Sequence, residues 1–318
     1  MLELIFSIVL AVISTFLIGI LVAAYLVYRK VFYQNPKKKI IDPYRVVKEG
    51  APDAEYKRAL IDSITSLEYE NIYTVSHDGL KLRARLYMTS PDAPFAIQCH
   101  GYRSTPMTDF SGGGALALKL GFNVIMIDQR AHGESDGRTI TFGYKESDDI
   151  VAWANYIGEH FGKDRKIILF GVSMGGSSVI LAAAKENLPK SVVGAFADCP
   201  FSSAKKIISE VIARMGMPPK LLYYFARLGA RLYGDFDPDR ATPEAVIKSI
   251  KIPLILVHGD ADTYVPHKMS ADMHATSDGK IPLHTFNGAN HGSSYIVDTE
   301  RYEKITEDFC KQCLEVTP

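Results

Sequence analysis

The segment KIILFGVSMGGSSVI, residues 166–180, decides the fold of this chain. It begins with an apolar run typical of a buried strand, passes through Gly171-Val-Ser173-Met-Gly175, and ends in small residues that favour a helix. This order predicts a sharp turn that exposes the Ser173 hydroxyl at a sheet edge. Gly171 and Gly175 are needed because a Cβ atom would collide where strand and helix approach. The helix N-terminus offers free N–H groups to a developing oxyanion.

A serine hydroxyl attacks an acyl carbon efficiently when a base accepts its proton and a carboxylate orients that base. After a serine turn of this kind, the expected chain order is acid and then histidine. A late apolar strand leads into Asp260 and Asp262, and we expect Asp262 to be the acid, with Asp260 as the alternative. His291 follows the last predicted strand among small residues, and we expect it to be the base.

Two backbone N–H groups are expected to stabilise the oxyanion. One belongs to Met174, directly after the serine, and the other to Tyr102, in the loop after a strand predicted at 95–100. We expect His100 to brace that loop and not to react. The polar segment 128–135 could be taken for a second active site or a metal site, but a hydrogen-bonded loop beside the serine turn is our interpretation. No metal site is predicted, because the following histidines lack metal-ligand spacing: His77, His160, His267, His274 and His284.

Strand-like and helix-like segments alternate from residue 67 onward. This alternation predicts a mostly parallel sheet with helices on both faces, whose first two strands form an antiparallel edge. A glycine-rich link is expected at 112–114. The predicted strands span 69–75, 82–88, 95–100, 123–128, 191–197, 253–258 and 282–286 besides the strand before Ser173, and the predicted helices span 55–66, 115–120, 146–161 and 294–314.

Residues 4–28 form an uncharged apolar run. At about 1.5 Å per residue, it is long enough to cross a hydrocarbon core of about 30 Å. A cleaved signal peptide is the alternative, but Glu3 is the only charge before the run and no polar mature start follows Ala23-Ala24. We therefore expect a transmembrane anchor with its basic flank at 1–35, a tether at 36–66 and a folded domain at 67–318.

Aromatic and basic residues follow the apolar run. We expect the aromatic residues to form a band at the membrane interface, and the bias of basic residues favours the cytoplasmic side for the folded domain. Anionic lipid headgroups are the natural partner of the lysines. The aromatic residues are Tyr25, Tyr28, Phe32 and Tyr33, and the basic ones are Arg29, Lys30 and the lysines at 37–39.

Composition places few limits beyond these. The chain has 318 residues, 47% of them hydrophobic, and a formal net charge of zero, so no global field attracts nucleic acid. Its four cysteines are too few and too scattered for a disulfide framework. Cys310 and Cys313 have redox spacing, but two thiols on one turn of a terminal helix is the simpler interpretation.

Taken together, five motifs make this chain resemble the α/β-hydrolase superfamily, and more narrowly the bacterial membrane-anchored serine hydrolases of its esterase and serine-aminopeptidase-like branch. The resemblance covers residues from about 67 to the C-terminus. It implies an eight-stranded sheet, no cofactor, and roles for Ser173, Asp262 and His291 as nucleophile, orienting acid and base. The motifs are His100-Gly101, Asp128-x-Arg130-x-His132-Gly133-x-Ser135, Gly171-x-Ser173-x-Gly175, His258-Gly259-x-x-Asp262 and His291-Gly292.

The alternation breaks at about 200–249, where the segment 207–233 is helical in pattern and Pro218-Pro219 interrupts it. We expect a helical cap above Ser173 that lines an apolar pocket, with an ordinary helix pair over the sheet as the alternative. The predicted activity is cleavage of small carboxylic esters with an apolar acyl part, through an acyl-enzyme. A serine peptidase on the same three residues and a non-catalytic scaffold of the same fold remain alternatives.

Overall fold

A single mixed sheet forms the centre of the molecule. The computed structural model describes residues 1–36, 42–47, 50–51 and 53–315. The strands lie in the order β1-β2-β4-β3-β5-β6-β7-β8. Strand β2 is antiparallel to β1 and β4, and every other pairing is parallel, which confirms the predicted sheet. The strands are β1 (Glu70–Val75), β2 (Lys81–Tyr87), β3 (Phe95–Cys99), β4 (Asn123–Ile127), β5 (Ile167–Val172), β6 (Val192–Asp198), β7 (Leu254–Gly259) and β8 (Leu283–Phe286).

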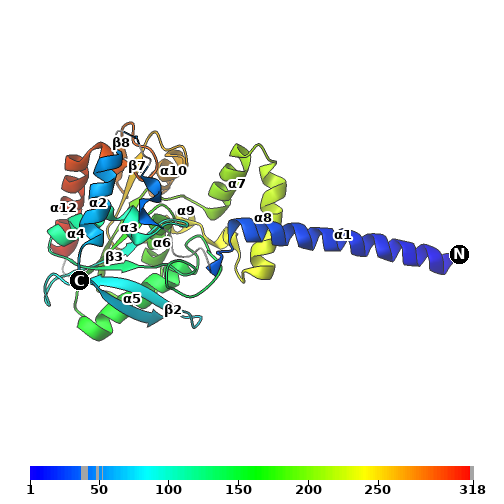
Figure 1. Ribbon diagram of the computed structural model, residues 1–318, viewed down its shortest axis with the longest axis horizontal. Coiled ribbons are helices and arrows are strands. Elements are labelled where there is room, and N and C mark those ends of the chain that lie inside the picture. Colours follow the sequence, from blue (N-terminus) through cyan, green and yellow to red (C-terminus); the bar gives the residue numbers. More distant parts are fainter. Residues whose placement is uncertain (37–41, 48–49, 52, 316–318) are drawn as a thin grey trace.

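Helices cover both faces of this sheet (Figure 1). One face carries α5 (Glu146–Phe161), α6 (Met174–Ala183), α9 (Pro243–Val246), η4 (Ile247–Ser249) and α10 (Lys268–Thr276). The other carries α2 (Ala54–Thr65), α3 (Pro106–Asp109), α4 (Ser111–Lys119), α11 (Ser294–Val297) and α12 (Thr299–Glu315).

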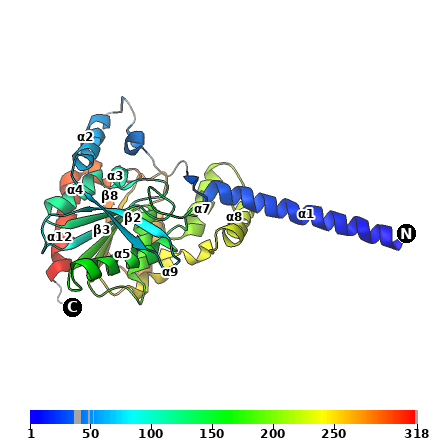
Figure 2. The ribbon, with the colours of Figure 1, turned by 60° about the horizontal axis from the view of Figure 1, so that its bottom comes forward.

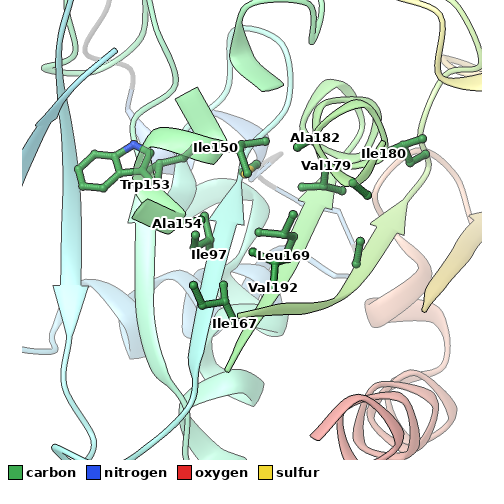
Figure 3. Packing of buried hydrophobic residues seen from close by; sticks show 14 of the residues in the cluster. Ile97, Ile150, Trp153, Ala154, Ile167, Leu169, Val179, Ile180, Ala182 and Val192 are labelled. Carbon is green, nitrogen blue, oxygen red and sulfur yellow. The ribbon is translucent and has the colours of Figure 1, made fainter. Parts of the chain in front are cut away.

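The two cores follow from the alternation of side chains along each strand. On the α5–α6 face, Trp153 of α5 and Val179 of α6 are fully buried with Ile97 of β3 and Leu169 of β5 (Figure 3). Ala96, the neighbour of Ile97, belongs instead to the core beneath α4 and α12. Burial on both faces explains why the parallel strands are continuously apolar in sequence.

Two details differ from the sequence-based expectation. The glycine-rich segment 112–114 is not a link but part of α4. A Cβ on Gly112 would lie 2.4 Å from the Tyr295 ring, so this helix needs glycine for close packing. The helix expected over 294–314 is divided into α11 and α12 at Asp298, whose φ of −147° is extended.

Three helices stand apart from the sheet. Helices α7 (Ala204–Arg214) and α8 (Pro219–Tyr233) lie between β6 and β7 in the chain, with the expected break at Pro218-Pro219. Helix α1 (Leu2–Val31) projects from the domain beside α8 (Figures 1 and 2). Two 3-10 turns, η2 (Pro43–Val46) and η3 (Pro238–Arg240), complete the described elements.

Helix α1 is long and apolar enough to cross a membrane, with a mean hydropathy of 2.8 over an 18-residue window in which no residue is buried. Its C-terminal end, however, packs into the domain. Phe32 is fully buried, with its ring centroid 5.6 Å from that of Phe142 and 5.2 Å from that of Phe236. Tyr28 is buried as well and its hydroxyl lies 2.7 Å from Thr139 Oγ1.

The expected aromatic band is therefore only partly available to a membrane. Tyr28 and Phe32 point into protein because α8 and the segment after β4 approach α1 closely, which local sequence does not reveal. Tyr25 is exposed. The basic cluster at 37–39 lies outside the described residues.

Candidate functional site

Ser173 lies at the turn between β5 and α6, where its backbone has φ 56° and ψ −116°. This left-handed conformation is costly for a residue other than glycine, and it turns the hydroxyl away from the chain. The flanking glycines permit it. A Cβ on Gly171 would lie 2.2 Å from Gly175 O, and a Cβ on Gly175 would lie 1.7 Å from Cys99 O. The predicted steric need for both glycines is confirmed.

The structure brings Ser173, His291 and Asp262 into one row. Ser173 Oγ lies 2.9 Å from His291 Nε2, and His291 Nδ1 lies 2.6 Å from Asp262 Oδ2. Asp262 follows β7 and His291 follows β8, so two neighbouring parallel strands deliver these side chains to the edge where β5 ends. Asp260 is exposed and its Oδ1 accepts a hydrogen bond from the amide of Gly288 instead.

Asp262 holds a network that sequence reasoning did not foresee. Besides His291, its Oδ2 accepts a hydrogen bond from His258 Nε2 at 3.2 Å, and its Oδ1 accepts from the amides of Tyr264 and Val265 at 2.7 and 2.8 Å. Burial opposes ionisation, but the hydrogen bonds from His258 and His291 outweigh it and hold the pKa of Asp262 well below its usual range. The motif His258-Gly259-x-x-Asp262 is the feature of the sequence that could have indicated the contact between these two side chains.

The expected oxyanion loop lies beside the nucleophile. A Cβ on Gly101 would come within 3.2 Å of Ser173 Cβ, which places the neighbouring Tyr102 next to the serine. His100 is fully buried, with Nδ1 donating to Gly101 O at 2.8 Å and Nε2 accepting from the amide of Gln129 at 3.2 Å. Burial lowers the pKa of His100, so the ring is neutral and braces the loop.

The polar segment 128–135 is a hydrogen-bonded loop, as interpreted from the sequence. Asp128 Oδ2 accepts from the amide of Glu134 at 3.0 Å. Arg130 pairs with Asp149 at 2.5 Å and with Asp78 at 2.9 Å. Asp78, Asp149 and His77 are close enough to one another to hold a metal ion, but the Arg130 guanidinium already supplies the positive charge there.

Two cavities of about 400 Å³ each meet at Ser173. We call the first the anchor-side cavity; its walls are almost entirely apolar and come largely from α1 and α7. We call the second the polar cavity; it lies toward α2 and α3, and Arg45, Lys57, Thr108 and His291 contribute to its walls. The helical insertion after β6 therefore does line an apolar space beside the serine.

Cys310 and Cys313 are both buried free thiols on α12, in keeping with the simpler interpretation of their spacing. Burial raises the pKa of each to about 12, which makes either thiol a poor nucleophile.

Asp198, at the end of β6, is a further buried carboxyl beside the row. It is 4% exposed, and its Oδ2 accepts a hydrogen bond from the Tyr302 hydroxyl at 3.0 Å. Burial raises its pKa from the ordinary 3.8 to about 6. Because the folded-state pKa is the higher one, the folded chain binds the proton more tightly, and stability is lost as pH rises through this window.

We expect Asp198→Asn, which stays neutral, to gain about 2 kcal/mol in unfolding free energy relative to the wild type between about pH 4 and pH 7. Denaturant unfolding of the full chain in detergent micelles at both pH values measures this gain. Asp260→Asn, which removes a solvent-exposed carboxyl, is the control, and the gain between the two pH values should be larger for Asp198→Asn. A difference between Asp198→Asn and the wild type that does not change with pH would contradict the expectation.

Comparisons with known proteins agree with this architecture. A family model described as the alpha/beta hydrolase fold matches residues 109–232. The curated YqkD protein of Bacillus subtilis, whose function is uncharacterised, is 27% identical over 214 residues, covering 67% of this chain and 70% of its own. A thiohydrolase of Aspergillus aculeatus, aneE, is 27% identical over 153 residues, 46% of this chain and 47% of that one.

Solved structures extend the match across most of the chain. The Pf2001 esterase of Pyrococcus furiosus has a TM-score of 0.64 and 25% sequence identity, covering 86% of this chain and 98% of its own. The Est1E protein of Butyrivibrio proteoclasticus, solved with ferulic acid bound, has a TM-score of 0.60 and 22% identity, covering 77% and 100%. The sheet order, the serine turn between β5 and α6, the family model and these solved structures together show that the chain has the α/β-hydrolase fold.

Proposed function

We propose that the protein is a membrane-anchored serine hydrolase that cleaves carboxylic esters through an acyl-enzyme. The observation that carries this proposal is the row from Ser173 Oγ through the His291 ring to Asp262, with contacts of 2.9 and 2.6 Å. These are hydrogen-bond distances along which a proton can pass. The esterase among the similar solved structures supports the choice of ester over other acyl substrates.

In the proposed mechanism, the Asp262 carboxylate accepts a hydrogen bond from the Nδ1–H group of His291, which leaves the Nε2 lone pair facing Ser173. Ser173 Oγ attacks the ester carbonyl while Nε2 takes the hydroxyl proton. The same proton then passes to the leaving alcohol as its bond to the acyl carbon breaks. Water then attacks the acyl-enzyme while His291 takes its proton, and the same proton passes to Ser173 Oγ as the bond between Oγ and the acyl carbon breaks and the carboxylic acid leaves.

The negative charge that develops on the carbonyl oxygen needs donors that are already in place. In this proposal, the amides of Met174 and Tyr102 supply them. Met174 begins α6, so its amide points out of the helix N-terminus and the helix dipole favours an anion there. The Tyr102 side chain is tied to α1 through a hydrogen bond from its hydroxyl to Val31 O at 2.6 Å, which restrains the loop.

Helix α1 is proposed to be a retained anchor and not a removed signal. Three of its residues and its C-cap contact the domain through packing that cleavage would destroy: Ala24, Tyr28 and Phe32 are buried, and Val31 accepts the Tyr102 hydrogen bond. In the same proposal, α7 and α8 are the cap expected at about 200–249. Protease treatment of intact cells would determine on which side of the membrane the domain lies. The basic flank favours the cytoplasmic side, so we expect the domain to be protected from added protease.

Fluorophosphonate labelling of membranes that contain the protein tests the proposal. We expect a covalent adduct on Ser173 and turnover of p-nitrophenyl butyrate that far exceeds turnover of aminoacyl p-nitroanilides. The reverse preference would favour the peptidase alternative. Failure both to label and to turn over either substrate would favour a scaffold and refute the enzyme.

A further inference from the structure

The two cavities at Ser173 differ in chemistry, and this difference would orient an ester bound between them. The anchor-side cavity is walled mostly by aliphatic, methionine and aromatic side chains, with Lys30 and Arg103 also in its lining, whereas the polar cavity contains more charged and hydroxyl groups. Ser173, Tyr102 and Tyr264 border both. An ester whose carbonyl sits at Ser173 would thus place one of its two arms in apolar surroundings and the other among polar groups.

Helix α1 is itself a wall of the anchor-side cavity, through Leu26, Val27, Lys30 and Val31. Opposite them stand residues of α7 and the α7–α8 turn, among them Val211 and Met215. The apolar arm of a substrate would therefore lie between the membrane helix and the helical insertion.

The position of this wall is fixed by close contacts. Gly229 of α8 allows the crossing, since a Cβ there would lie 2.3 Å from Ala24 O. On the other side, Arg103 Nη2 donates to Lys30 O at 3.1 Å and to Tyr33 O at 3.0 Å. These contacts hold the last turns of α1 against the domain, so the α1 wall of the cavity is part of the folded structure.

The rim of the cavity includes the C-terminal part of α1, the helix that is long and apolar enough to cross a membrane. Leu26 and Met215 line the cavity, yet they are 61% and 56% exposed. Before Leu26, most apolar side chains of α1 are exposed, although Ala24 is buried and α8 packs beside residues 15–20. Arg29 and Lys30 follow directly, and basic residues at this position are typical of the headgroup region. The exposed rim of the cavity therefore lies in part on the same helix as the apolar segment that could cross a bilayer.

We propose that the anchor-side cavity binds the acyl chain of an amphiphilic ester that enters directly from the bilayer, with α1 serving as both anchor and acyl-site wall. The substrate class is a long-chain carboxylic ester of a small polar alcohol. Cleavage would release that alcohol through the polar cavity, and water would free the fatty acid from Ser173 to return to the membrane. This inference rests on the proposed serine esterase activity.

The test uses the full chain in phosphatidylcholine vesicles with two probes, water-soluble p-nitrophenyl butyrate and bilayer-resident monooleoylglycerol. Val27→Trp fills the cavity from its α1 wall. We expect it to lower the ratio of monooleoylglycerol to butyrate turnover at least ten-fold. Val22→Trp is the matched control, because Val22 is an exposed α1 valine outside the cavity lining, and it should keep both activities. A ratio within two-fold of wild type in Val27→Trp would overturn the proposal.

A second measurement needs no turnover and covers the case in which the bulky variant fails to fold. A thiol is introduced by Val27→Cys, and Ser173 is then reacted with either a hexadecyl or an ethyl fluorophosphonate. The hexadecyl chain should slow maleimide labelling of the introduced thiol at least ten-fold, and the ethyl group should not. Equal labelling after both reagents would overturn the proposal. Arg29→Cys, outside the lining, should label equally in both.

Failure of this inference is distinguishable from failure of the esterase proposal. Wild-type protein that neither reacts with fluorophosphonate nor cleaves butyrate refutes the esterase, and the inference falls with it. Wild-type protein that cleaves butyrate but ignores monooleoylglycerol in its own vesicles refutes the bilayer-entry inference alone.

Discussion

Replacement of Ser173 by alanine is expected to lower kcat for p-nitrophenyl butyrate by about 10⁶-fold, the size of effect seen when a catalytic serine is removed from an intact triad. The physical reason is that His291 Nε2 would have no hydroxyl to deprotonate, so the acyl-enzyme could not form. Active-site titration must accompany the assay, so that trace wild-type enzyme is not counted as residual activity.

The fold should survive this substitution. Alanine carries the same Cβ as serine, so the strained backbone at φ 56° is no more costly, and the side-chain hydroxyl contacts His291 and not the core. Ser178→Ala is the control, since this buried hydroxyl donates to Met174 O within α6 and should leave kcat within a few-fold. Turnover by Ser173→Ala near the wild-type rate, with matching thermal unfolding, would mean that another group is the nucleophile.

Asp262→Asn is expected to lower kcat by about 10⁴-fold. The side-chain amide would present N–H groups where Oδ2 now accepts from both His258 and His291, so the imidazole of His291 would lose the acceptor that fixes its tautomer. Its Nε2 would then carry the proton and could not receive one from Ser173. Steady-state kinetics on butyrate measure the loss, which should appear in kcat more than in KM.

Asp260→Asn is the matched control, two residues away on the same loop. Asp260 is exposed, and its contact with the Gly288 amide can be replaced by the asparagine carbonyl, so we expect kcat within about two-fold of wild type. A larger loss in Asp260→Asn than in Asp262→Asn would transfer the acid role to the residue that sequence reasoning kept as the alternative.

The sequence predicted much of this architecture because the information is local. Continuous apolar runs mark strands buried on both faces, and the glycines around Ser173 mark a turn where backbones nearly touch. The candidate acid and base could be located since each directly follows a strand of a parallel sheet, and such strand ends meet at one edge.

What the sequence left unresolved depends on contacts between distant segments. The sequence around Gly112 suggested a link, and only the contact with the distant Tyr295 ring explains why a helix needs glycine there. His258 was recognised within a motif, but its bond to Asp262 requires that the loop after β7 folds back over the strand end. The packing of α1 against α8 depends on Gly229, which lies far from α1 in the sequence and allows the two helices to cross closely. Neither composition nor periodicity reveals these contacts between segments that are distant in the sequence.

The docking of α1 also has a practical consequence for handling the protein. A chain begun at residue 36 would lack Phe32 and Tyr28, and would uncover the apolar surface of Phe142, Phe236 and the α8 crossing that they now cover. Exposed patches of this kind promote aggregation. Truncation to obtain a soluble fragment should therefore yield precipitate, and preparations that retain the whole chain in detergent or lipid discs are the suitable material for purification and assay.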